Sequence, residues 1–265
     1  MEVGTGAQLA SIIVSVVFLS VSSIYDLKKR EVEDWIWWAY GPIGLSLTII
    51  RLFVDPSSLL TTLIAMGVGI GFSLALGYFG LFGGADAKAM ICLSLTLPLN
   101  PTIIHPLLGY VHPVFPVVVM VEAFFCSAIL AVWFAVTNLF RYIRSRKSMF
   151  EGLENEPSWK KVMACILGYP VKIAKLRSTF YLYPLEEVNV DDGVTRRSFK
   201  LYVSAETDRD QLVSELSASL GQGGNQGDVW VTPGIPMLLF ILAALVLVLV
   251  FGDAIFSTVL ILARR

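Results

Sequence analysis

Two aspartates, Asp26 and Asp86, stand at the edges of long uncharged runs and are the residues of this chain best suited to chemistry. A carboxylate at the edge of hydrocarbon is costly to keep ionised, so a membrane protein that carries one usually uses it. Two carboxylates that share one proton titrate apart, so one can accept a proton from water while the other polarises a carbonyl. The pair predicts peptide hydrolysis without a metal or cofactor.

The residues around Asp86 also suit a substrate site. Gly83, Gly84 and Ala85 precede it, and the two glycines lack side chains that would keep an extended substrate backbone away from the acid. Lys88 follows by two positions and cannot share the helical face of Asp86. We interpret Lys88 as an anchor that reaches lipid headgroups, with a substrate or structural contact as the alternative.

The elements that must position these residues are membrane helices. Apolar residues make up 55% of the chain, and they gather in blocks without Asp, Glu, Lys or Arg at residues 9–25, 35–50, 56–85, 89–121 and 229–252. A span needs about 20 mostly apolar residues, so these blocks and the run at 114–140 predict about six transmembrane helices. The expected fold is an all-α polytopic membrane protein with a small α+β insert.

Basic residues predict the orientation of these helices. Lys28, Lys29 and Arg30 follow the first run, and the basic segment 141–147 follows the fifth. Lys and Arg near span ends favour the cytoplasmic side, and alternating spans can place both groups there. Asp26 and Asp86 would then lie at the cytoplasmic side of the cell membrane. Arg51 and the C-terminal arginines at 264–265 would lie outside, which conflicts mildly with the rule.

Small residues indicate tight helix packing. Ser11, Ser15 and Ser22 share one helical face with Asp26, and Gly67 and Gly71 form a small-xxx-small pair. We expect both groups to pack against neighbouring helices.

The sequence divides into three domains: a transmembrane domain at 1–140 with five spans and both aspartates, a cytosolic insert at 141–228, and a final transmembrane helix at 229–265. The first half of the insert is basic and should lie along anionic headgroups. Strands are expected at 180–185 and 198–204, and a helix at 208–220. The remaining expected features are a turn at Asp191-Asp192-Gly193, a capping box from Thr207 to Asp210, a flexible linker at 221–227, and solvated carboxylates at Glu186, Glu187, Asp191 and Asp192.

Other site chemistries lack support in the sequence. Cys92, Cys126 and Cys165 show no C-x-x-C spacing, so neither a zinc site nor a disulfide framework is expected. The sequence has no phosphate-binding glycine loop and no basic-aromatic array for nucleic acid.

The segment Gly83-Gly84-Ala85-Asp86 resembles the Gly-x-hydrophobic-Asp form of the Gly-x-Gly-Asp aspartyl protease signature. Asp86-Ala87-Lys88 is similar to the Asp-x-Lys of type IV prepilin peptidases. Asp26, followed by Arg30, Val32 and Asp34, resembles the segment after their first catalytic aspartate. The whole layout resembles archaeal preflagellin peptidases, with a first-span Asp, a fourth-span Asp, a cytosolic insert and one late span.

The resemblance implies a membrane aspartyl endopeptidase that removes short basic leader peptides from preflagellin (archaellin) or prepilin-like precursors. It implies catalytic roles for Asp26 and Asp86. The motif residues Gly83, Gly84, Ala85 and Lys88 would bind substrate or support the site. The zinc-loop cysteines of the bacterial members are absent, and no Ile-Pro follows Asp26, which favours the archaeal branch. A presenilin-like protease is disfavoured because no Pro-Ala-Leu follows the two aspartates.

A transporter that uses intramembrane carboxylates is the alternative class. Glu122 within the fifth run supports it, although a buried, hydrogen-bonded glutamate is the simpler interpretation. Transporters commonly show inverted repeats with broken helices, and we find no such repeat.

Overall fold

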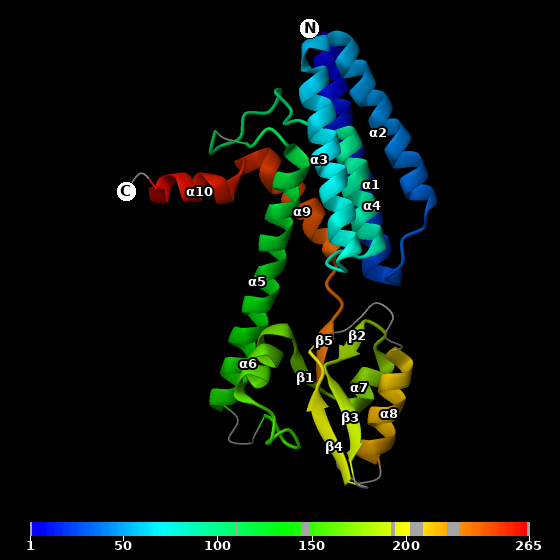
Figure 1. Ribbon diagram of the computed structural model, residues 1–265, viewed down its shortest axis with the longest axis vertical. Helices are drawn as coiled ribbons and strands as arrows, with labels where there is room; N and C mark the ends of the chain where they lie inside the picture. The colour runs from blue at the N-terminus through cyan, green and yellow to red at the C-terminus, as the bar shows by residue number, and fades with distance from the viewer. Residues whose placement is uncertain are drawn as a thin grey trace. The chain divides into compact units, whose positions relative to one another are not determined.

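The computed structural model describes residues 2–109, 111–144, 149–191, 194–201, 209–221 and 228–263. The chain forms two compact units. Unit 1 comprises residues 1–127 and 236–265, and unit 2 comprises residues 128–235. Figure 1 shows that unit 1 is helical, whereas unit 2 combines helices with strands.

Unit 1 is built from a bundle of helices with apolar exteriors. The helices that lie wholly within it are α1 (Glu2–Lys29), α2 (Trp35–Val54), α3 (Leu59–Tyr78), α4 (Gly84–Thr96), α9 (Met237–Phe251) and α10 (Ala254–Ala263), together with the 3-10 turn η1 (Pro56–Ser58). The long helix α5 (Phe115–Arg144) begins in unit 1 and ends in unit 2. Large apolar side chains such as Leu60, Phe72 and Ile129 are exposed on these helices, as expected for a lipid-facing surface.

Four of the described helices are long and apolar enough to cross a membrane: Val3–Lys29, Trp35–Val54, Pro56–Tyr78 and Phe115–Arg144. This supports a multi-pass membrane protein, but the expected count of six spans is not confirmed. Helix α4 has 13 residues and α9 has 15, and both fall short of the roughly 20 residues of a full span.

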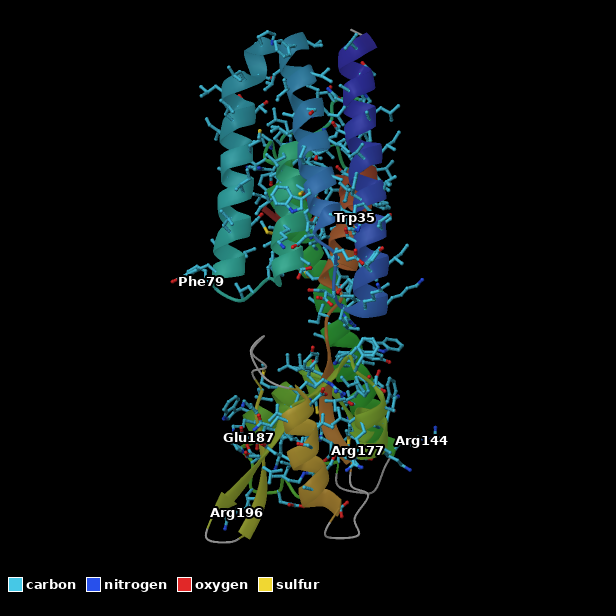
Figure 2. The ribbon with its side chains drawn as sticks, turned by 90° about the vertical axis from the view of Figure 1, so that its right-hand side faces the viewer. Trp35, Phe79, Arg144, Arg177, Glu187 and Arg196 are labelled. Carbon is cyan, nitrogen blue, oxygen red and sulfur yellow. The ribbon has the colours of Figure 1, made fainter. Side chains whose placement is uncertain are left out.

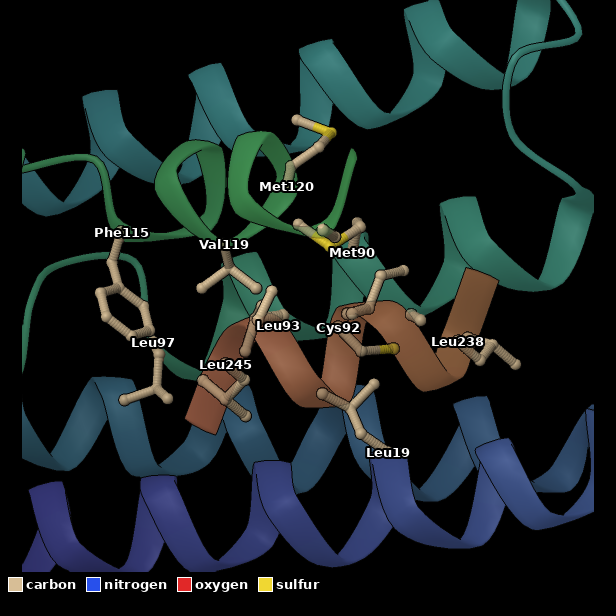
Figure 3. Close-up of a cluster of buried hydrophobic side chains, with 14 of the residues drawn as sticks. Leu19, Met90, Cys92, Leu93, Leu97, Phe115, Val119, Met120, Leu238 and Leu245 are labelled. Atoms are coloured by element: carbon tan, nitrogen blue, oxygen red, sulfur yellow. The ribbon is translucent and has the colours of Figure 1, made fainter. Parts of the chain in front are cut away.

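The core of unit 1 lies between α1, α2, α4, α5 and α9. Figure 3 shows Leu19, Leu93, Val119 and Leu245, from four different helices, pointing toward one another. Leu19 and Leu93 are fully buried. Helix α4 therefore lies inside the bundle, where its neighbours fix its position.

Unit 2 is a small α+β structure. Its three-stranded antiparallel sheet has the order β1 (Tyr169–Lys172), β5 (Asp228–Pro233), β2 (Leu182–Pro184). A separate hairpin joins β3 (Glu186–Asp191) to β4 (Val194–Phe199). Its helices are α6 (Ser158–Leu167), α7 (Ile173–Ser178) and α8 (Arg209–Gly221). In Figure 2 the labelled charged side chains Arg177, Glu187 and Arg196 belong to this unit.

Some expected elements of the insert are found and others are shifted. The expected helix at 208–220 corresponds to α8, and the expected strand at 180–185 contains β2. The second strand lies earlier than expected, at Val194–Phe199, because β4 pairs with β3 rather than with β2. Asp192, Gly193, Thr207 and most of the expected linker at 221–227 lie outside the described residues.

The expected start of the last membrane helix is wrong. Residues Asp228–Pro233 form β5, the central strand of the sheet, and α9 begins at Met237. Val229 and Val231 are completely buried in the core of unit 2, and Trp230 is nearly so. A short apolar run can be a buried strand or a helix segment, and its composition alone does not distinguish them.

The expectation of a solvated Glu186 is also wrong. Its side chain is fully buried, and Oε1 accepts a hydrogen bond from the Trp230 backbone N–H at 2.7 Å. Its Oε2 accepts a hydrogen bond from Nε of Arg197 at 2.7 Å and lies 2.6 Å from Nη2 of the same guanidinium in an ion pair. Burial raises the pKa of Glu186, and the Arg197 guanidinium opposes that rise. Glu186 therefore joins the hairpin to the sheet as a structural residue.

Candidate active site

Asp26 lies in the last turn of α1. The helix ends three residues later at Lys29, and the backbone N–H of the next residue, Arg30, donates to the Asp26 carbonyl at 3.0 Å. Arg30 has a φ of 57°, the left-handed conformation that commonly closes a helix. This closure brings the Arg30 charge near the half-buried Asp26 carboxylate, and the two interact electrostatically.

Asp86 lies in the first turn of α4. Its Oδ2 accepts a hydrogen bond from the backbone N–H of Gly83 at 3.1 Å, and the N–H of Ala87 donates to the Gly83 carbonyl at the same distance. An acid in the first turn satisfies a free N–H group there and complements the helix dipole. The beginning of α4 therefore fixes the orientation of the half-buried Asp86 carboxylate.

The two acids come together at one end of unit 1. Helix α1 packs against α4, and the C-terminal end of α1 and the start of α4 lie at the same end of the bundle (Figure 1). The charges of Asp26 and Asp86 are close enough to interact. The arrangement is chemically suited to a shared proton. Among the described residues, no group of three or more His, Cys, Asp and Glu side chains could hold a metal ion.

The three residues before Asp86 differ in the space around them. A Cβ atom at Gly83 would lie 3.1 Å from Oδ2 of Asp86, whereas a Cβ at Gly84 would meet nothing within 4 Å. Ala85 is half-buried and packs against the core. Gly83 thus leaves room for the Asp86 carboxylate, and Gly84 faces open space beside it.

Lys88 is engaged in a contact within the protein. Its Nζ lies 2.6 Å from Oδ1 of Asp34, the residue that precedes α2. Both side chains are exposed, so the pair is worth about 1 kcal/mol or less. The contact nevertheless joins the start of α2 to the start of α4, two residues from Asp86. Sequence reasoning noted Asp34 and Lys88 separately and missed their pairing, because nothing local links positions 54 residues apart.

Close contacts with α2 and α3 hold the rest of α4. A Cβ at Gly44 would overlap Thr96, and a Cβ at Gly69 would overlap Ser94, so both glycines allow a near approach of backbones. The hydroxyl of Thr48 also donates to the Leu95 carbonyl at 2.7 Å. These contacts fix α4 at its C-terminal half, and its position in turn sets that of Asp86.

The packing surface of α3 differs from the expected one. Gly67 and Gly71 are exposed, and a Cβ at either would meet nothing within 4 Å. Gly69 and the buried Ser73 face the bundle instead. The serine expectation for α1 is confirmed, since Ser11, Ser15 and Ser22 are completely buried.

Glu122 has a structural partner. It is buried in α5, and its Oε1 accepts a hydrogen bond from the backbone N–H of Ile255 at 3.1 Å. The Oδ1 of Asp253 accepts from the N–H of Phe256 at 2.8 Å. The two carboxylates cap the first turn of α10, which agrees with the simpler interpretation of Glu122.

Fold and site together define a multi-pass membrane protein with two acids at one end of its helical bundle. The model of the type IV leader peptidase family matches residues 13–136, and that of the archaeal peptidase A24 C-terminus, type II, matches residues 160–254. The chain is thus similar to type IV leader peptidases, and both matches support a protease. The first match contains both aspartates, and the second contains most of unit 2 and α9.

Three relatives named preflagellin peptidase align along almost the entire chain. The Methanocaldococcus jannaschii protein is 27% identical, over 93% of this chain and 96% of the relative. Those of Methanococcus voltae and Methanococcus maripaludis are each 23% identical, over 91% and 92% of this chain and 95% of each relative. The expected resemblance to preflagellin peptidases is thus confirmed.

Proposed function

We propose that this chain is an aspartic endopeptidase that removes short basic leader peptides from preflagellin or prepilin-like precursors. The observation that carries the proposal is the approach of Asp26 and Asp86 from two helices to one end of the bundle, where their charges interact. The names of the relatives support the substrate class. Glu122 is the residue that supported a transporter. Its carboxylate instead accepts a hydrogen bond from the first turn of α10.

In the proposed mechanism the two carboxyl groups hold one proton between them. The ionised carboxylate accepts a proton from the attacking water, and the protonated one donates a hydrogen bond to the scissile carbonyl. The Gly83 N–H bond to Asp86 orients one of the acids. The open space at Gly84 admits the extended substrate backbone. No metal or cofactor takes part in these steps.

The proposed site faces the cytoplasm. Lys28 and Lys29 close α1 three residues or fewer after Asp26, and basic residues at a span end favour the inner side of the membrane. A substrate with a basic leader before an apolar helix would present the junction between them at this depth.

The test uses purified protein in detergent and a peptide that carries the leader junction. Asp26→Asn and Asp86→Asn should each reduce turnover at least about a thousandfold, because an amide can neither ionise nor share the proton. The matched control is Glu31→Gln, which neutralises an exposed carboxylate five residues after Asp26 and should stay active. Retention of a few per cent of turnover by either Asp variant would exclude that residue from a dyad.

A further inference from the structure

Unit 2 contains a basic pocket with no role in the proposed peptidase reaction. The pocket has a volume of about 260 Å³, and Arg141 of α5, Lys172 of β1 and Lys175 of α7 line it together with Tyr169 and Asp228. It is smaller than the roughly 300–1,000 Å³ typical of pockets for drug-sized ligands. Its size and charge suit a small anionic group.

The three cations are available to a ligand. Arg141, Lys172 and Lys175 are exposed, and within the part of the chain that the structure describes none of them lies within 4.0 Å of a carboxylate oxygen. With Asp228 as the single lining acid, the pocket has a net charge of about +2 from its ionised side chains. Burial raises the pKa of Tyr169, so its phenol remains a hydrogen-bond donor at neutral pH.

The pocket is a built feature rather than a chance grouping of lysines. The side-chain amide of Asn138, buried in α5, donates to the carbonyls of Cys165 and Gly168 at 2.9 and 2.6 Å. A Cβ at Gly168 would overlap the Val231 carbonyl, so α5 holds the chain entering β1 closely against β5. The Arg141 guanidinium also donates to the Pro170 carbonyl at 3.4 Å. One wall of the pocket is thus fixed to the helix that provides Arg141.

The position of Arg141 points to lipid as the source of the anion. Helix α5 has 30 residues and is therefore about 45 Å long, which exceeds the roughly 30 Å of bilayer hydrocarbon. Its basic end, with Arg141, Arg144 and the exposed Tyr142, has the composition of a membrane–water interface. With the apolar part of α5 in the hydrocarbon, a pocket beside its basic end would lie near the depth of the lipid phosphate groups.

A second exposed surface of unit 2 supports the same source. In α6, Trp159, Val162 and Met163 are exposed and follow the i, i+3, i+4 spacing of a single helical face. Such a face, with Lys160 and Lys161 in the same helix, is typical of a helix that lies in the membrane surface. Asn138 joins the end of α6 to α5 through the Cys165 carbonyl.

We propose that the pocket formed by Arg141, Lys172 and Lys175 binds the phosphate of an anionic lipid headgroup and thereby holds unit 2 at the membrane surface. The guanidinium of Arg141 and the two ammonium groups would pair with the phosphate oxygens, and Tyr169 would donate a further hydrogen bond.

The test measures binding of phosphatidylglycerol to the purified full-length protein in detergent by native mass spectrometry, with phosphatidylcholine as the uncharged comparison. The triple variant Arg141→Gln/Lys172→Gln/Lys175→Gln should bind phosphatidylglycerol at least about tenfold more weakly than the unmodified protein. The charge-matched control Lys28→Gln/Arg144→Gln/Arg196→Gln removes three exposed cations outside the pocket lining and should stay within about threefold of it.

Equal losses in the two triple variants would overturn the proposal, because they would show diffuse attraction rather than a site. Displacement of the lipid by inorganic phosphate as efficiently as by glycerophosphoglycerol would also overturn it, because the pocket would then take free phosphate. If the triple variant does not fold, Lys172→Gln/Lys175→Gln tests the same point, since within the described part of unit 2 neither lysine ammonium group donates a hydrogen bond to another residue. That double variant should lose about fivefold or more in affinity.

Discussion

Lys88 and Asp34 illustrate how an exposed contact can matter through its position. The pair contributes little to stability, but it joins the beginnings of α2 and α4 at the end of unit 1 that holds Asp86. We therefore interpret Lys88 as a positioning residue rather than as a lipid anchor. Asp34, the exposed residue that precedes α2, shares that role.

Removal of either partner should lower turnover moderately. Lys88→Ala and Asp34→Asn are each expected to reduce kcat by about threefold to tenfold, because the start of α4 loses one restraint. The reversed pair Lys88→Asp/Asp34→Lys should recover part of the activity in a peptide assay. If the reversed pair recovers no activity and the Lys88→Ala variant has a raised KM, Lys88 would instead be assigned to substrate binding.

Gly83 and Gly84 should respond differently to the same substitution. Gly83→Ala places a Cβ against Oδ2 of Asp86 and should lower kcat about tenfold, since a displaced carboxylate is misaligned for the reaction. Gly84→Ala meets open space in the free protein, so its effect should fall on KM if substrate occupies that space. Steady-state kinetics on both variants separates the two effects, and identical profiles would contradict this assignment.

Glu186 is the residue on which unit 2 should depend most. Glu186→Ala leaves Arg197 without its buried partner and the Trp230 N–H without an acceptor, and should destabilise unit 2 by about 3 kcal/mol. Glu187→Ala is the matched control, because Glu187 is partly exposed and its nearest cation, Lys200, is 3.7 Å away. Limited proteolysis of the two variants should show early cleavage of unit 2 only in the first.

At the scale of elements, α4 is the helix whose placement decides the site. It is too short to span a membrane alone, and it is held between α2 and α3 partly by close contacts at Gly44 and Gly69, where a side chain would overlap α4. We call these close contacts of α4 with Gly44 and Gly69 the glycine clamp. The clamp is sensitive to added side-chain volume, because protein interiors are close-packed. The orientation of Asp86 therefore depends on residues well away from it.

The clamp can be tested with two glycines of the same helix. Gly69→Ala forces its Cβ against Ser94 and should destabilise unit 1 by about 1–3 kcal/mol while lowering turnover. Gly67→Ala adds the same atom on the exposed face of α3 and should leave both quantities nearly unchanged. Thermal unfolding in detergent and a peptide assay provide the two readouts, and equal behaviour of the variants would refute the clamp.

At the scale of the whole molecule, the proposed site selects its substrate by depth. Asp26 lies in the last turn of a membrane-length helix, so the proposed pair of acids would reach only a peptide bond held near that end. A helical peptide bond is hydrogen-bonded and shielded, so the junction must become extended before cleavage. Local sequence next to the cut bond would then matter mainly through size.

Moving the start of the substrate's apolar run should therefore move or abolish cleavage. A shift of about three or four residues, one helical turn, displaces the original bond from the depth of the acids. Substitutions deep in the substrate helix should have little effect. Mass spectrometry of the products in bilayer nanodiscs identifies the cut bond, and unchanged cleavage after the shift would mean that local sequence selects it.

The sequence alone determined the features that depend on local composition. Long apolar runs predict membrane helices because hydrocarbon admits backbone only when its polar groups are satisfied within the segment. Asp26 and Asp86 stand out because each lies at the end of such a run. Their resemblance to the leader peptidase motifs followed from neighbouring residues, and the family was predicted from it.

Tertiary structure decided whatever depends on residues distant in the chain. The pairing of Lys88 with Asp34, the burial of Glu186 beside Arg197 and the choice of Gly69 over Gly67 as the packing face are not encoded in any local period. The strand β5 is a further example, because its apolar residues could equally begin a membrane helix. Only its pairing with β1 and β2 on its two edges shows that it is a strand. Hydrophobicity specifies that a residue is removed from water, whereas only the assembled fold specifies its neighbours.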